Sequence, residues 1–376
     1  MTDDKATPAQ LITAVDSAVT RVRTRALDVS FNELFDMYRS GELVISPEYQ
    51  RLFRWPESKQ SQFIESLILE LPIPPIYLIE VEDGIYELID GLQRISSYFH
   101  FRGIHPNKSD DEGGGLVLTG CDVLPDLNGS TYESLPQAIQ IKLKRHFIRM
   151  EVLRRETENQ FRYHMFKRLN TGGEILSPQE IRNCTIRLLD NTFNDFLKDM
   201  AKLPSYLECM EQLTDEKREQ MYLEEYVLRF FALKNNREGY SKEVGEFLTS
   251  YMESVADSSK SVSFDYRVEK AAFETTFDFL NEAFGNGAFS GYNSRGNPMG
   301  YFSSLHFEAF SLGLQKYLGE ISALDQDERE VVFEGLRSIK SDPEFKRLTT
   351  GGGKNYSAAL NQRVEFVERK VAECLC

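Results

Sequence analysis

The feature that most constrains the fold is a strand-to-helix corner in the segment YELIDGLQRISSYFHF, residues 86–101. The apolar residues before Asp90 are typical of a short strand, and those after Gly91 have the spacing of an amphipathic helix. Another apolar run precedes this strand, and the two are joined at Asp83-Gly84, which is a strong hairpin signal between apolar segments. The sequence therefore predicts a hairpin that leads directly into a helix.

The C-terminal half of the chain is dominated by helical patterns. At Ser177, a capping box with Glu180 and a proline at the next position predict the start of one of these helices. We therefore expect an α+β fold in two domains, with a small sheet-containing domain at residues 26–190 and a mostly α-helical domain at residues 191–376. A polar N-terminal arm at residues 1–25 precedes them.

Composition bears on several classes of partner. The net charge of −15 over 376 residues argues against wholesale coating by nucleic acid or an anionic membrane surface, although it is compatible with a local basic face. The five cysteines form no CxxC pair and no zinc-finger spacing with histidine. The N-terminus lacks the apolar stretch of a secretory signal, and no run of about 18 apolar residues is present. We expect a cytoplasmic protein with no membrane partner.

The corner has the composition of a phosphate-binding site. A helix N-terminus presents unpaired backbone N–H groups and the positive end of the helix dipole, and Gly91 permits close approach of a ligand. Arg94, one turn into the helix, can donate two hydrogen bonds to phosphate oxygens. Asp90 repels a phosphate unless a cation lies between them, and a Mg²⁺ ion held by Asp90 and the phosphates would resolve this. Gln93 would then orient a water molecule for attack on phosphorus.

A structural alternative explains the same residues, because Asp90 can cap the helix while Arg94 pairs with a nearby acid. The segment PEYQRLFRW favours the phosphate site. It places Tyr49, Gln50 and Arg51 just before a predicted helix, where an aromatic ring can stack on a base and arginine can bind phosphate. Here too an alternative stands, namely a tryptophan in the core and an arginine on the surface.

Residues 139–187 form a basic stretch, with eleven lysines and arginines against five glutamates. A strip of this sign can hold a nucleic-acid backbone or nucleotide phosphates. Alternating charges on a solvated helix explain many of the same residues. The residues assigned to DNA contact are Lys142, Lys144, Arg145 and Arg149. Lys354 and Arg363, near the C-terminus, are further candidates for contact with nucleic acid.

The order of these motifs resembles a known family. The segments PEYQR, RW, PIPPIYL, DGLQR and FKRLNTGGEILSPQEIRN follow one another as in the N-terminal domain of GmrSD-type restriction endonucleases, within the ParB/sulfiredoxin-like superfamily. The resemblance covers roughly residues 26–190. It implies a ParB/sulfiredoxin-like nucleotide-binding domain that binds and often hydrolyses a nucleoside triphosphate, to license or regulate attack on foreign DNA.

With the corner chemistry, this resemblance predicts a Mg²⁺-dependent hydrolase of ATP, GTP or CTP that acts on or is regulated by DNA. Catalysis is expected at Asp90, Gln93 and Arg94, with Asp90 as the metal ligand. The expected nucleotide-binding residues are Tyr49, Gln50, Arg51, Gly91, Arg94, Arg168 and Asn170.

The chain departs from the family pattern in two places. Leu92 stands where many relatives carry a second glutamine. Many relatives also carry an HNH-type nuclease, which needs a histidine base, but only His306 remains after residue 190. Two alternatives to a hydrolase therefore stand. One is a non-hydrolysing nucleotide-sensing subunit or antitoxin that controls a separately encoded nuclease, and the other is a nuclease that acts through carboxylates. A homo-oligomer is compatible with each.

Overall fold

The computed structural model describes residues 7–46, 49, 53–105, 114–157, 159–170, 177–187, 189–240, 243–257, 262–293 and 298–375. The chain divides into two compact units, Met1–Leu176 and Ser177–Cys376. The sequence analysis placed this division after residue 190. The segment after Ser177 falls in the second unit because the helix that it begins packs against other helices of that unit.

The first unit is built on a five-stranded sheet with the order β1-β5-β3-β4-β2. Its strands are β1 (Thr24–Ser30), β2 (Leu43–Val44), β3 (Ile76–Glu82), β4 (Ile85–Asp90) and β5 (Phe147–Leu153). The β1/β5 and β3/β4 pairs are antiparallel, whereas β3/β5 and β2/β4 are parallel. The sheet is therefore mixed, which confirms the α+β prediction. Thr24 and Arg25 belong to β1 and pair with β5, so the N-terminal arm expected at residues 1–25 ends before Thr24.

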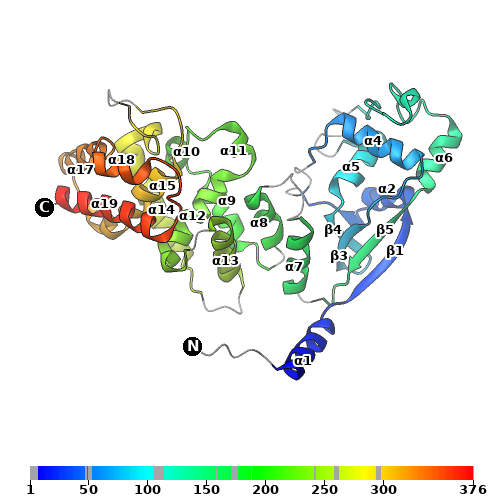
Figure 1. Cartoon of the computed structure of the whole chain (residues 1–376), viewed down its shortest axis with the longest axis horizontal. Coiled ribbons are helices and arrows are strands. Elements are labelled where there is room, and N and C mark those ends of the chain that lie inside the picture. The colour runs from blue at the N-terminus through cyan, green and yellow to red at the C-terminus, as the bar shows by residue number, and fades with distance from the viewer. Residues whose placement is uncertain are drawn as a thin grey trace. The chain divides into compact units, whose positions relative to one another are not determined.

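The helices of this unit are α1 (Pro8–Val19), α2 (Phe31–Ser40), α4 (Glu57–Ile68), α5 (Leu92–Phe101), α6 (Gln137–Arg145) and α7 (Asn159–Asn170). Helix α2 begins where the Ser30 side chain accepts a hydrogen bond from the Glu33 N–H and ends at Gly41, whose φ of 81° is left-handed. Helices α4 and α5 lie side by side (Figure 1) and bury their apolar faces, including Ile64 and Ile95. These helices support the strands that lead to the corner.

The expected hairpin and corner are both present. The hairpin turn between β3 and β4 falls at Asp83-Gly84, where Gly84 has a φ of 77°. Strand β4 ends at Asp90, and α5 begins two residues later at Leu92. Strand β5, which comes much later in the chain, pairs between β1 and β3.

Among the described residues of the second unit, the regular elements are helices, apart from one isolated antiparallel bridge between Tyr292 and Pro298. Its α-helices are α8 (Pro178–Ile186), α9 (Thr192–Met200), α10 (Pro204–Cys209), α11 (Asp215–Glu219), α12 (Tyr222–Asn236), α13 (Val244–Ala256), α14 (Tyr266–Phe284), α15 (Ser304–Gly313), α16 (Leu318–Ala323), α17 (Gln326–Ile339), α18 (Pro343–Thr349) and α19 (Ser357–Leu375) (Figure 1). The capping box at Ser177 and Glu180 is formed as predicted. Aromatic side chains such as Phe230, Phe273 and Phe277 form much of the core.

Buried charges also occur in this unit. The Arg363 side chain is fully buried and pairs with Glu308, which also accepts a hydrogen bond from Arg229. Arg363 is therefore enclosed, so the expectation that it contacts nucleic acid is wrong. None of the helices among the described residues has the length and apolar character needed to cross a membrane.

Candidate functional site at the strand-to-helix corner

The glycine of the corner is required by the backbone and by packing. Gly91 has a φ of 108°, a conformation that L-residues rarely adopt. A Cβ atom at this position would lie 2.4 Å from Cγ2 of Ile76, which is buried at the start of β3. This space is filled by Ile76, so the turn and close packing account for a glycine at this position, and the expected contact of Gly91 with a nucleotide stays a prediction.

Arg94 and Asp90 form an ion pair across the first turn of α5. One guanidinium nitrogen of Arg94 donates to Oδ2 of Asp90 at 2.9 Å, and another donates to the carbonyl oxygen of Pro74 at 3.1 Å. The Arg94 side chain is 13% exposed and the Asp90 side chain 32% exposed. The pairing of Arg94 with a nearby acid, which the sequence left as an alternative, is therefore present.

The other half of that alternative is absent from the structure, because no side chain among the described residues caps α5. The N-cap is Gly91, which has no side chain to accept a hydrogen bond. The positive end of the α5 dipole thus lies beside the remaining guanidinium N–H groups of Arg94 and the second oxygen of Asp90. This arrangement can receive an anion, and a carboxylate already paired with arginine repels that anion less.

Gln93 connects the corner to a distant segment. Its Oε1 accepts hydrogen bonds from the backbone N–H groups of Arg54 and Trp55, each at 3.1 Å. The Trp55 ring packs edge-on against Phe63 at 6.1 Å, and Lys59 lies 5.1 Å from the Trp55 ring centre. The structure therefore places Gln93 as a link between two motifs, a role that sequence reasoning missed because the partners are backbone groups far away in the chain.

Tyr49 is also joined to the corner strand. Its hydroxyl group donates to the carbonyl oxygen of Ile89 at 3.1 Å, and the residue is only 3% exposed. The ring is therefore buried and does not present an open stacking face. The predicted nucleotide-binding residues Gln50 and Arg51 lie outside the described residues.

The predicted residues Arg168 and Asn170 lie on α7, which packs against β4 within the first unit (Figure 1). Arg168 is exposed, and the Asn170 side chain lies outside the described part of the structure. The helix reaches the strand that leads to Asp90. Helix α7 is therefore adjacent to the strand that leads to the corner. Residues that close the site must lie in such a position.

Much of the basic strip is engaged in surface ion pairs. Lys142 pairs with Glu70 at 3.1 Å, and Arg149 pairs with Glu151 at 2.9 Å. Of the four residues predicted to contact DNA, the two without an ion-pair partner among the described residues are Lys144 and Arg145. Exposed ion pairs contribute little energy and exchange readily for other partners, so the paired residues remain available to phosphate.

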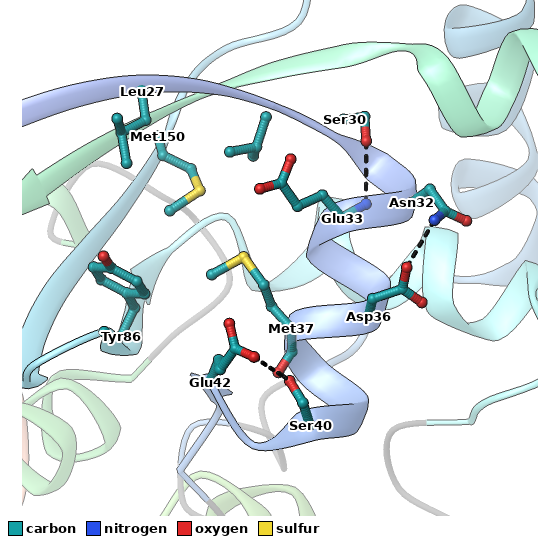
Figure 2. A pocket seen from close by; sticks show the side chains of 12 residues that line it. Leu27, Ser30, Asn32, Glu33, Asp36, Met37, Ser40, Glu42, Tyr86 and Met150 are labelled. Atoms are coloured by element: carbon teal, nitrogen blue, oxygen red, sulfur yellow. Dashed lines mark hydrogen bonds between the residues drawn. The ribbon is translucent and has the colours of Figure 1, made fainter.

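A separate pocket of about 540 Å³ lies between α2 and the sheet (Figure 2). Its lining includes the carboxylates of Glu33, Asp36 and Glu42 and an apolar floor with Met37 and Met150. Asp36 accepts a hydrogen bond from Asn32, and Glu42 accepts one from Ser40. Three carboxylates disfavour a polyphosphate by charge repulsion, so the corner is a better anion site than this pocket.

The fold and the corner together define an α+β domain in which strand β4 brings Asp90 to the N-terminus of α5, which no described side chain caps, and Arg94 lies in the first turn of that helix. Residues 31–187 match the model of the GmrSD restriction endonuclease N-terminal domain, and this part of the chain belongs to that family. The presence of this domain suggests a component of a restriction or defence system that acts on DNA. Comparison with curated proteins and with solved structures gave no significant match.

Proposed function

We propose that the first unit binds a nucleoside triphosphate at the corner and hydrolyses it, as a DNA-regulated component of its restriction or defence system. The observation that supports this most is the uncapped N-terminus of α5 beside the Asp90–Arg94 pair. Backbone N–H groups, a helix dipole and a partly free guanidinium are the groups that hold polyphosphates in proteins. The nucleotide is ATP, GTP or CTP.

In this proposal, Arg94 keeps its hydrogen bond to Asp90 and donates its remaining N–H groups to phosphate oxygens. The Asp90 oxygen that does not contact Arg94 is suited to Mg²⁺, which is commonly bound by one or two carboxylates together with phosphate oxygens. When bound there, the ion would neutralise developing charge on the phosphates. Arg168 and Asn170, which lie on α7, would close the site beside β4. The nucleotide contacts expected of Gln50 and Arg51 stay predictions from the sequence.

Gln93 acts in this proposal mainly as a positioning residue. Its Oε1 is occupied by the backbone N–H groups of Arg54 and Trp55, so it holds the segment after Arg51 against the corner. Orientation of an attacking water by the same oxygen requires release of these two hydrogen bonds. Nucleotide binding that displaces the segment would provide that release and would couple binding to hydrolysis.

The test is release of inorganic phosphate by the purified chain with Mg²⁺ and each of the three nucleotides, with and without DNA. Arg94→Ala should lower nucleotide affinity by roughly 10-fold or more, because hydrogen bonds to charged groups contribute about 1.5–3 kcal/mol. Arg94→Lys keeps the charge but lacks the planar guanidinium group, so it should retain only part of the wild-type nucleotide affinity. Arg39→Ala, at an exposed position on α2, is the matched control and should behave as wild type. No nucleotide binding by the wild-type chain would sink the proposal.

The second candidate is a nucleotide-sensing subunit that binds without hydrolysis and controls a separately encoded nuclease. The occupied Oε1 of Gln93 favours it, since that oxygen is the expected water ligand. His306 is also buried, and burial lowers its pKa to about 3, so it is unsuited to act as a nuclease base. Nucleotide binding that depends on Arg94, without phosphate release under any condition, would select this candidate over the hydrolase.

A further inference from the structure

A hollow on the first unit, distinct from the corner, combines an exposed aromatic ring with basic side chains. It has a volume of about 620 Å³, within the usual range for small-molecule sites. Helix α6, the start of β5 with the residue before it, and Glu70, which is two residues after α4, form it. Its lining includes Glu70, Ile141, Lys142, Arg145, His146 and Phe147.

The aromatic ring of this hollow is open to solvent. Phe147 is 65% exposed, and Ile141 beside it is 41% exposed. Along β5 the side chains alternate, so Ile148 and Met150 enter the core while Phe147 and Arg149 face outward. Phe147 has no ring partner among the described residues. Single exposed apolar residues are common, but an exposed ring at the wall of a basic hollow offers a stacking surface.

The hollow is lined by two cationic side chains and one carboxylate, in a chain of net charge −15. Lys142, Arg145 and His146 line the hollow, and Glu70 is its one acidic lining residue. Glu70 pairs with Lys142 at 3.1 Å, with side chains 62% and 45% exposed, so this pair is screened by solvent. Arg145 has no ion-pair partner in the described part of the chain. The hollow is therefore suited to a phosphate group.

We propose that this hollow binds one unpaired nucleotide of a single DNA strand, with its base stacked on Phe147 and its phosphate held by Arg145 and Lys142. The inference extends the proposed function by naming the form of DNA that the basic strip contacts. A base can offer its face to a protein ring only when it is unstacked, which excludes an intact duplex. An acidic peptide would satisfy the cations but would leave the Phe147 ring uncovered, so it fits less well.

The test measures binding of a labelled single-stranded oligothymidine and of a duplex of equal length by fluorescence anisotropy, without nucleoside triphosphate. Phe147→Ala should weaken single-strand binding at least about fivefold, as expected for loss of one stacked base, and Phe147→Trp should retain it. Val123→Ala is the matched control, because Val123 is also 65% exposed but lies outside the hollow. Arg145→Ala should weaken binding and reduce the dependence on salt by about one ion.

Glu70 provides a gain-of-function variant. It adopts a φ of 58°, where glycine is preferred, so Glu70→Gly removes the one lining carboxylate without backbone strain. This variant should bind the single strand more tightly than wild type and melt at an equal or higher temperature. Equal binding of single strand and duplex, or equal affinities for wild type and Phe147→Ala, would overturn the inference. Because nucleotide is omitted, these outcomes are independent of whether Arg94 binds triphosphate.

Discussion

Substitution of Gly91 by alanine tests the structural account of the corner. The new methyl group would lie 2.4 Å from Cγ2 and 3.1 Å from Cβ of Ile76, which is fully buried and paired with Met150 of β5. An L-residue at a φ of 108° costs about 1–3 kcal/mol, and overpacking a core contact adds about 1–3 kcal/mol. We therefore expect Gly91→Ala to lower the free energy of unfolding of the first unit by about 2–6 kcal/mol.

The matched control is Gly84→Ala in the hairpin turn. Gly84 has a φ of 77°, but nothing lies within 4 Å of the position of an added Cβ. Only the backbone cost of about 1–2 kcal/mol applies there. The difference between the two variants therefore measures the contact with Ile76, and it should be at least about 1 kcal/mol.

The assay is urea denaturation followed by tryptophan fluorescence. The chain has one tryptophan, Trp55, which packs against Phe63 in the first unit and so reports on that unit alone. The midpoint at constant slope gives the change in free energy. If Gly91→Ala destabilises the unit no more than Gly84→Ala does, the close packing of the corner against Ile76 is refuted.

Two further predictions concern the second unit. Glu308→Gln should lower its free energy of unfolding by about 3–5 kcal/mol, because Arg363 and Arg229 lose the carboxylate that neutralises them in a buried site. Far-UV circular dichroism during denaturation would measure this loss. A loss no larger than that of an exposed substitution such as Val331→Ala would contradict the prediction. Burial lowers the pKa of His306 to about 3, so the unfolded chain binds a proton below about pH 6.5 that the folded chain excludes. The free energy of unfolding should therefore fall as pH drops from about 6.5 toward 3, by at most about 1.4 kcal/mol per pH unit from this group. His306→Gln should make the free energy of unfolding depend less on pH in this range. An unchanged pH profile in the variant would argue against a neutral buried histidine.

Local patterns were sufficient to predict several elements and part of the candidate site. The hairpin at Asp83-Gly84 and the helix start at Ser177 depend on residues within a few positions of one another. The sequence offered pairing of Arg94 with a nearby acid as one alternative, and the structure shows that this acid is Asp90, one helical turn away. That Glu308 would neutralise Arg363 could not be predicted, because the two side chains meet only when α15 and α19 pack.

The sequence by itself determined the α+β division, the strand-to-helix corner and the family of residues 31–187, because short-range periodicity and motif order carry that information. Only the tertiary structure decided that Gln93 binds the backbone at Arg54 and Trp55 and that Phe147 is exposed beside Arg145. Strand β5 reaches its place between β1 and β3 through long-range pairing. Long-range pairing sets which face of a strand is buried, and the hydrophobic character along the chain does not specify which strands pair.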